Sequence, residues 1–327
     1  MRAHAQAVII GGGVGGCSIA YHLTEMGWRD IVLVERSELT SGSTFHSAGL
    51  VGQLRSSVSL TLMMMYSVEL YRRLKEETGK DPGWREVGSL RLASSKERME
   101  ELRRQAGWAK TFGLPLEEIS AKEAQDLFPI MSIKDVVGAL YLPTDGHIDP
   151  NGLTYALAEG AKKRGAKIWT ETRVLGISVK NGQVHEVATN KGIICTDVIV
   201  NAGGMFAPEI GRMAGVTIPI IPIAHQYLIT KPLYGVGSTF PTMRDPDLLV
   251  SFREEVGGLV MGGYERNPAP WGLEGIPESF NSTLLSPDWD RFCPLMENAV
   301  KRVPSLQHAE VIRLVNGPEG FTPDGEF

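Results

Sequence analysis

The sequence predicts an α/β fold in which a Rossmann-like dinucleotide-binding domain is interleaved with an α+β domain built on a mixed or antiparallel sheet. Three observations support this prediction. A strand, a glycine-rich loop, a helix and a second strand follow one another within the first 35 residues. Later segments alternate between apolar and polar residues, as half-buried strands do. Helix patterns separate these groups of strands, so neither domain is continuous along the chain.

The glycine-rich loop follows an apolar strand over 7–10 and occupies positions 11–16. In the G-x-G-x-x-G pattern, the first glycine permits a tight turn, the second lets a pyrophosphate approach the backbone, and the third lets helix and strand pack closely. The helix that follows, predicted over 17–26, offers free N–H groups and a partial positive charge to phosphates. The residues predicted to bind these phosphates are Gly11, Gly13, Val14, Gly15 and Gly16.

A second apolar strand over 31–34 is followed by Glu35 and Arg36. Glu35 stands where a carboxylate accepts hydrogen bonds from the ribose hydroxyls of a dinucleotide, and we expect Arg36 beside it at the cofactor. A glycine pattern alone is a weak signal, but the strand, helix, second strand and acid all have the expected spacing. This unit alone leaves NAD and a flavin dinucleotide both possible, and a structural turn with a surface carboxylate is the other alternative.

The remaining elements are predicted from periodicity, caps and turns. Apolar residues recur at helical spacing from Leu62 to Leu74, Ser120 opens a capping-box pattern, and Asn181-Gly182 predicts a hairpin. Helices are predicted over 60–78, 96–112, 120–128, 151–164, 288–303 and, after a glycine turn at 202–204, up to 213. Strands are predicted over 89–92, 138–142, 168–169, 173–180, 184–188, 197–200, 220–230, 248–253, 259–264 and 311–315.

These elements group into two discontinuous domains. The dinucleotide-binding domain is predicted to comprise 1–85, 150–216 and 309–327. The second domain, over which a substrate would lie, is predicted to comprise 86–149 and 217–308.

Positions 41–50, Ser-Gly-Ser-Thr-Phe-His-Ser-Ala-Gly-Leu, resemble a motif of the dimethylglycine dehydrogenase and sarcosine dehydrogenase family. In that family the histidine of this motif is bonded covalently to FAD, so the resemblance implies a flavin link at His46 in an FAD-binding domain of the glutathione reductase type. An imidazole nitrogen is a competent nucleophile, although a buried structural histidine is the alternative. Phe45 stands where relatives usually have tryptophan. The resemblance implies further cofactor contacts at Gly42, Ser43, Thr44, Gly49, Leu50, Val174 and Phe206.

The resemblance extends in order along the chain. The segments that carry it are 141–150, 201–207, 225–227, 262–265 and 316–325. It implies an FAD-dependent amine dehydrogenase or oxidase that demethylates an N-methylated glycine, dimethylglycine or sarcosine, by hydride transfer to flavin N5. Two alternatives stay open. One is an oxidase of another methylated amino acid, such as 4-methylaminobutanoate, and the other is a non-catalytic regulatory subunit with the same fold.

Four residues are candidates for the substrate site. His225 lies in an apolar strand, where burial favours the neutral imidazole that could accept the amine proton or orient the amine. Tyr264 could donate to a substrate carboxylate. Arg55 and Arg253 are weaker candidates for a carboxylate clamp, since a guanidinium binds a carboxylate through two parallel hydrogen bonds. For each residue a purely structural role is the alternative.

Composition limits the partners. Among 327 residues the net charge is −5 without a basic run, so we expect a small-molecule N-methyl amino acid as substrate rather than nucleic acid. No apolar stretch has the length of a membrane span. The three cysteines are scattered and lack metal-ligand spacing, so no metal site is predicted, and they favour a reducing compartment. We expect a bacterial cytoplasmic protein, or a mitochondrial matrix protein whose leader has been removed.

The last residues, 316–327, resemble a family segment that leads into another strand. The sequence therefore suggests a truncated chain that lacks the C-terminal part of the FAD-binding domain. Relatives continue into a folate-binding module, so folate is expected only if the full protein carries that module. An electron-transfer flavoprotein is an expected partner by the same resemblance.

Overall fold

The glycine-rich segment forms the predicted strand–loop–helix–strand unit in the computed structural model, which describes residues 2–325. Strand β2 (Ala7–Ile10) leads through the loop into helix α1 (Val14–Glu25), and β3 (Ile31–Val34) follows. The helix begins before its predicted start at 17, because the last two loop glycines already belong to its first turn. Met1, Glu326 and Phe327, which the predicted domain ranges include, lie outside the described residues.

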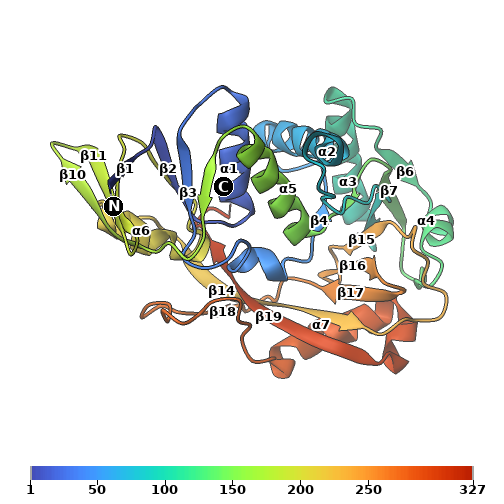
Figure 1. Cartoon of the computed structure of the whole chain (residues 1–327). Helices are drawn as coiled ribbons and strands as arrows, with labels where there is room; N and C mark the ends of the chain where they lie inside the picture. The colour runs from blue at the N-terminus through green and yellow to red at the C-terminus, as the bar shows by residue number, and fades with distance from the viewer. Residues whose placement is uncertain (1, 326–327) are drawn as a thin grey trace.

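Strands β2 and β3 lie at the centre of a four-stranded parallel sheet ordered β13–β2–β3–β9, with β13 at Ile199–Asn201 and β9 at Lys167–Trp169. Successive side chains alternate across this sheet. Ala7 and Ile9 pack toward the helices, whereas Val8 and Ile10 pack toward a second sheet (Figure 1). Coverage of both faces explains why these strands are apolar at every position.

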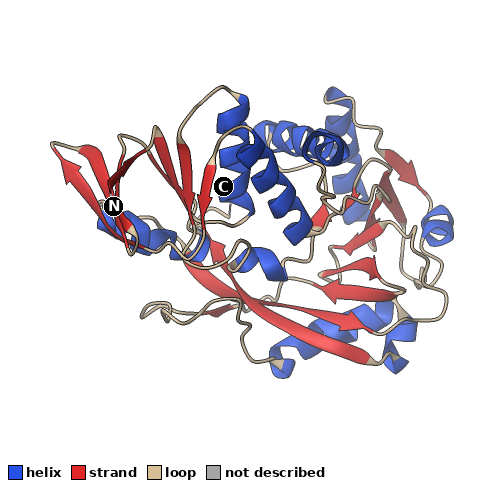
Figure 2. Cartoon of the chain, in the orientation of Figure 1, coloured by secondary structure: helices blue, strands red, loops and turns tan. Residues whose placement is uncertain are grey.

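The helices of the chain cover the sheets as Figures 1 and 2 show. Helices α1, α2 and α5 pack together beside the parallel sheet. Ser120 and Glu123 form the predicted capping box. The helices after α1 are α2 (Val58–Thr78), α3 (Lys96–Thr111), α4 (Ala121–Leu127), α5 (Pro150–Lys163), α6 (Ala207–Met213) and α7 (Trp289–Arg302). The short 3₁₀ helices are η1 (Ser43–His46), η2 (Gly204–Phe206) and η3 (Pro304–His308).

The second sheet, ordered β1–β12–β11–β10, covers the other face of the parallel sheet. Its strands are β1 (Arg2–His4), β10 (Val174–Lys180), β11 (Gln183–Thr189) and β12 (Gly192–Cys195). The predicted hairpin at Asn181-Gly182 joins β10 to β11, and both turn residues have positive φ. Neither β1 nor β12 was predicted, because each is too short to show a clear alternation.

The larger half of the molecule is a nine-stranded sheet ordered β18–β14–β17–β16–β15–β5–β7–β6, with β19 paired to β14. Its pairs are antiparallel except β15 with β5, so the predicted mixed sheet and α/β fold class are confirmed. The strands are β5 (Ser89–Ala93), β6 (Glu117–Ile119), β7 (Gly138–Leu142), β14 (Ile221–Thr230), β15 (Thr242–Asp245), β16 (Val250–Glu255), β17 (Gly258–Gly262), β18 (Ala269–Pro270) and β19 (Val311–Phe321).

Strand β19 is longer than predicted and pairs with β14 from Val311 to Phe321. The sequence prediction ended this strand at 315, because Asn316-Gly317-Pro318 has the composition of a turn. A long partner strand keeps that segment extended instead. The domain division stays a prediction, but its boundary at 309 does not coincide with the edge of the nine-stranded sheet.

Candidate functional site

The glycine loop presents an open helix end. Gly13 caps α1 without a side-chain hydrogen bond, and the first turn contains no acidic residue. A Cβ atom added to Gly15 or Gly42 would meet no other atom within 4 Å, and one added to Gly13 would meet only Thr44 Oγ1, at 3.1 Å. The Val14 N–H donates to that same Oγ1 at 3.1 Å. The loop and the 42–44 segment therefore border a space lined by backbone donors and a hydroxyl.

Two loop glycines are required for packing. Gly11 has a φ of +119°, and a Cβ there would lie 2.3 Å from the Ala202 carbonyl oxygen. A Cβ on Gly16 would lie 1.9 Å from the Gly11 carbonyl oxygen. The turn at 202–204 thus packs directly against the loop.

Glu35 lies at the end of β3 and is 9% exposed. Its Oε2 accepts the Gly12 N–H at 2.6 Å, and its Oε1 accepts the Ser37 N–H at 2.9 Å. Burial raises the pKa of Glu35, which the two backbone donors partly offset. The carboxylate braces the glycine loop, and its remaining lone pairs are available to a ribose.

Arg36 and Phe206 stack on each other, with the guanidinium carbon 4.6 Å from the ring centroid. The same guanidinium donates to the Glu278 carbonyl, while the Glu278 carboxylate pairs with Arg173 at 2.6 Å. Arg173 immediately precedes Val174, the buried first residue of β10. The structure therefore links three predicted cofactor residues, Arg36, Phe206 and Val174, to one loop of the larger half.

His46 is 5% exposed at the end of η1. A Cβ added to Gly317 would lie 2.5 Å from the imidazole Nδ1 and Cε1, so the ring lies directly on the backbone of β19. Ser43 Oγ donates to the Pro318 carbonyl at 2.7 Å and fixes η1 to the same strand. Burial lowers the pKa of His46 to about 4, which keeps the imidazole neutral at physiological pH.

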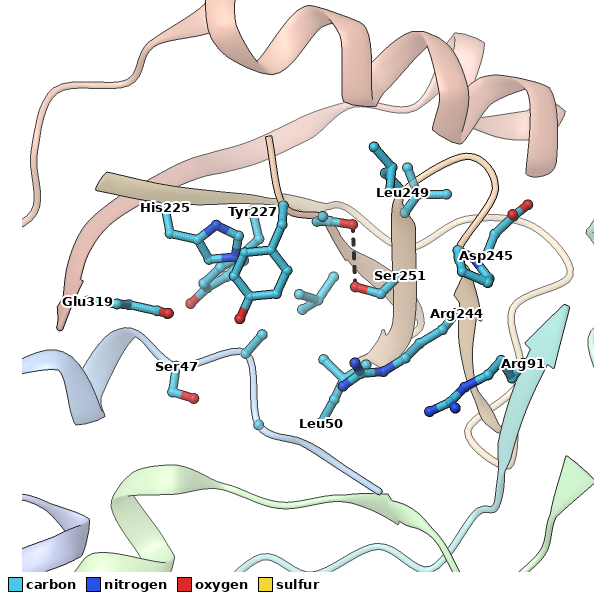
Figure 3. Close-up of a pocket in the computed structure, with 18 of the residues that line it drawn as sticks. Ser47, Leu50, Arg91, His225, Tyr227, Arg244, Asp245, Leu249, Ser251 and Glu319 are labelled. Atoms are coloured by element: carbon cyan, nitrogen blue, oxygen red, sulfur yellow. Dashed lines mark hydrogen bonds between the residues drawn. The ribbon is translucent and has the colours of Figure 1, made fainter. Parts of the chain in front are cut away.

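A cavity of about 450 Å³ opens beside this motif (Figure 3). One wall is the segment from Ser47 to Leu50, which follows His46 directly. Gly49 in this wall has a φ of +72° and approaches the Ile148 carbonyl, where a Cβ would lie at 2.3 Å. Leu50 pairs with His147 through the short strands β4 (Leu50–Val51) and β8 (Gly146–His147). The opposite wall is the open face of the nine-stranded sheet.

His225 and Tyr264 lie together on that opposite wall. Their rings stack with centroids 4.4 Å apart and planes 16° apart. Glu265 Oε2 lies 3.4 Å from His225 Nδ1, and its side chain is 9% exposed. Burial raises the pKa of Tyr264, which therefore stays a phenol hydrogen-bond donor. The structure brings the two predicted catalytic residues into one cluster.

The two arginines predicted as carboxylate clamps do not line this cavity. Arg253 Nε donates to the Ala48 carbonyl at 2.6 Å, and its guanidinium also contacts Glu255. Arg253 therefore holds the wall of the cavity in place. Arg55 is half-buried behind the cavity, and its Nε has no hydrogen-bond partner within residues 2–325.

Most of the residues that line the cavity were not predicted from the sequence, among them Tyr227, Arg244, Arg91 and Glu319. A signal for the arginines was available. Arg91 alternates with buried Leu90 and Leu92, and Arg244 follows buried Met243. Each arginine must therefore lie on the face of the sheet opposite the core.

The donor set fits a dinucleotide such as FAD. The open helix end, the glycines that border free space and the terminal carboxylate match the needs of pyrophosphate and ribose. Within the described chain, no three or more histidine, cysteine or acidic side chains form a group that could hold a metal ion. Across residues 2–325, no helix has the length and apolarity needed to cross a membrane.

Comparison with known proteins identifies a family for this site. The family described as DAO, FAD dependent oxidoreductase, matches residues 6–327. The chain is 40% identical to the pyruvate dehydrogenase phosphatase regulatory subunit of Mus musculus over 99% of its length. It is 38% identical to dimethylglycine dehydrogenase of Rattus norvegicus over 98% of its length. It spans only 37% and 38% of those two proteins.

The structural likeness leads to the same family. L-proline dehydrogenase from P. horikoshii superposes with a TM-score of 0.88 and is 30% identical. The match covers 99% of this chain and 83% of that one. The chain therefore belongs to the DAO family of FAD dependent oxidoreductases.

Proposed function

We propose that the protein oxidatively demethylates an N-methylated glycine, dimethylglycine or sarcosine, with FAD as cofactor. The observation that carries the proposal is the cavity between the segment following His46 and the stacked His225–Tyr264 pair. A substrate in this cavity would lie between the 47–50 wall, which we expect to follow the flavin ring, and the His225–Tyr264 pair. Both of these side chains can form hydrogen bonds with an amine. The relatedness to dimethylglycine dehydrogenase supports this substrate class.

The residues of this chain would divide the work. The glycine loop and Thr44 would hold the pyrophosphate, Glu35 the ribose, and His46 would anchor the flavin covalently. Bound FAD would supply the acceptor for a hydride from the N-methyl carbon. His225, held by Glu265 and stacked on Tyr264, would orient the amine and accept its proton, because the free lone pair is needed for oxidation.

The experiment that tests this proposal follows flavin and product together. Wild-type protein is precipitated with acid, and the yellow colour should stay in the pellet, whereas in His46→Ala it should move to the supernatant. Formaldehyde release from dimethylglycine and sarcosine is measured on the same preparations. Formaldehyde release with flavin attached supports the proposal, and a flavin-loaded protein inactive on both substrates overturns it.

A regulatory subunit is the second candidate function, because a relative at 40% identity carries that name. The presence of His46 argues against it, since the resemblance implies that regulatory relatives lack the linking histidine. A protein that stays colourless after expression with excess FAD would favour the regulatory role. An oxidase of 4-methylaminobutanoate is the remaining enzymatic alternative, and parallel turnover assays with that substrate distinguish it.

Partners and location stay proposals. We expect an electron-transfer flavoprotein as electron acceptor, and folate only where a further module accompanies this one. The mammalian relatives are named mitochondrial, which supports a matrix location, and a bacterial cytoplasm is the alternative. Reduction of purified electron-transfer flavoprotein by the substrate-loaded protein tests the first expectation.

A further inference from the structure

Two arginines stand side by side in the cavity without a counter-ion. Arg244 on β15 and Arg91 on β5 are register partners in the parallel pair of those strands. Adjacent strands lie about 4.8 Å apart, and paired residues face the same side of the sheet. Both side chains lie along the same end of the cavity in Figure 3. Like charges at paired positions repel, so this arrangement costs free energy unless an anion joins it.

The nearby acids make their ion pairs and hydrogen bonds with other residues, although the charge of Asp145 raises the pKa of both arginines. Asp245 is bound to buried Arg302 at 2.7 Å, and Glu101 is bound to Arg98 at 2.5 Å. Asp145 accepts from Ser89 and Gln53.

The two arginines have few partners of their own. Within residues 2–325, the Arg244 side chain makes no ion pair or hydrogen bond, and the Arg91 side chain donates only to the amide oxygen of Gln105, at 2.5 Å. Burial lowers the pKa of both arginines, and the Arg91 guanidinium lowers the pKa of Arg244 further. Arg55, behind them, adds positive charge without supplying a counter-ion.

The other end of the cavity is acidic. Glu319 on β19 lines it beside Tyr264 and Tyr227 and, in Figure 3, lies at the opposite end from the arginines. Within the described residues its carboxylate makes no hydrogen bond or ion pair. Burial raises the pKa of Glu319, which the charge of His225 partly offsets, so a cationic group beside it would favour the carboxylate. The neighbouring tyrosine rings suit a methylated ammonium group.

We infer that this cavity recognises both charges of a zwitterionic amino acid: Arg91 and Arg244 bind its carboxylate, and Glu319 binds its ammonium group. The inference rests on the proposed function and specifies how its substrate is held. It assigns the carboxylate to residues other than the Arg55 and Arg253 expected from the sequence. It also predicts that a methylamine without a carboxylate binds poorly.

Three small probes separate the two charges. Dimethylglycine carries both, its methyl ester carries only the cation, and methoxyacetate carries only the anion. Dissociation constants are measured by calorimetry on the protein with its flavin chemically reduced under anaerobic conditions, so that no turnover occurs. Wild type should bind dimethylglycine more tightly than either singly charged probe.

Three variants remove one charge each. Arg244→Gln should raise the dissociation constants of dimethylglycine and methoxyacetate about 30-fold or more. The dissociation constant of the ester should stay within about threefold of the wild-type value. Arg91→Gln should weaken the binding of the same two probes. Glu319→Gln should weaken the binding of dimethylglycine and of the ester but not of methoxyacetate. Arg98→Gln is the matched control, because Arg98 lines the cavity but is already paired with Asp247 and Glu101. It should leave all three probes within about threefold.

The outcomes separate this inference from the proposed function. If Arg244→Gln changes all three affinities equally, or none of them, carboxylate recognition by the arginines is wrong. If wild type binds the ester as tightly as dimethylglycine, two-charge recognition is likewise wrong. Charge-selective binding without any formaldehyde release overturns the proposed function alone. If the protein is isolated without flavin, the same titrations on that protein test whether the cavity recognises the two charges.

Discussion

The contact between His46 and Gly317 fixes the position of one imidazole. Because a Cβ on Gly317 would come within 2.5 Å of the ring, Gly317→Ala should displace His46 from β19. We predict that the covalently bound fraction of flavin falls at least severalfold in this variant, as measured by acid precipitation. Gly320→Ala is the control, since its Cβ would meet a methyl group of Ile220 at 3.0 Å and the Met205 backbone only at 3.7 Å, and it should keep the link. Full covalent attachment in Gly317→Ala would contradict the proposed role of this packing.

His46 also predicts a pH dependence of stability. Its pKa in the folded chain is about 4, against an ordinary 6.5, because of burial. Between these values the unfolded chain binds a proton that the folded chain does not, so the free energy of unfolding falls as pH falls from 6.5 toward 4. The loss from this group is about 3 kcal/mol. Urea unfolding of flavin-free protein across this range measures it.

His46→Gln is the comparison for that experiment. The variant should lose less stability than wild type over the same pH interval, because it lacks the titrating group. His147 also has a pKa lowered to about 4 by burial, so some pH dependence should remain. Identical pH profiles for wild type and His46→Gln would show that folding does not lower the pKa of His46.

At the scale of elements, a buried arginine joins α7 to the large sheet. Arg302, at the end of α7, is fully buried and binds Asp245 on β15 at 2.7 Å and Asp135 at 2.9 Å. Arg302→Met leaves Asp245 buried without its partner, so we expect a loss of about 3–5 kcal/mol in the free energy of unfolding. Urea denaturation measures it. Arg302→Met combined with Asp245→Asn should recover part of this loss, and equal stability of the single and double variants would contradict the argument.

The connection between β18 and α7 crosses from the large sheet to the cofactor segment. Its Ser282 N–H donates to the Ser41 carbonyl at 3.0 Å, its Glu278 carbonyl accepts from Arg36, and the Glu278 carboxylate pairs with Arg173. Because Glu278 is exposed, Glu278→Gln should leave the thermal midpoint unchanged while loosening this connection. We predict faster proteolytic cleavage between 271 and 287 and faster release of non-covalent FAD from a His46→Ala background. Glu310→Gln, which breaks another exposed pair, should change neither rate.

On the scale of the whole molecule, FAD should stabilise one half first. The glycine loop, Glu35 and the 42–46 segment all belong to the cofactor side, so FAD at a hundred times its dissociation constant should add about 2.7 kcal/mol to stability. Hydrogen exchange should slow in 11–46 and 202–206 before it slows in the nine-stranded sheet. Protection that appears first in the nine-stranded sheet would place FAD elsewhere.

Most individual elements were predictable from local sequence. The apolar strands at 7–10 and 31–34, the long helix α2 and the capping box of α4 follow from periodicity and caps within a few neighbouring residues. Short strands such as β12 and β15 were missed, since four residues show too little pattern. Their extended backbone depends on hydrogen bonds to strands distant in sequence.

The sequence by itself determined the family and predicted the dinucleotide loop and a flavin link at His46, because glycines, a terminal acid and a histidine at fixed local spacing form a recognisable pattern. Only the tertiary structure decided which side chains meet in the cavity. Arg91 and Arg244 lie far apart in the sequence and become neighbours through the β5–β15 pairing, while Arg253 is engaged by the Ala48 carbonyl. Register between distant strands sets these positions, and local composition does not encode it.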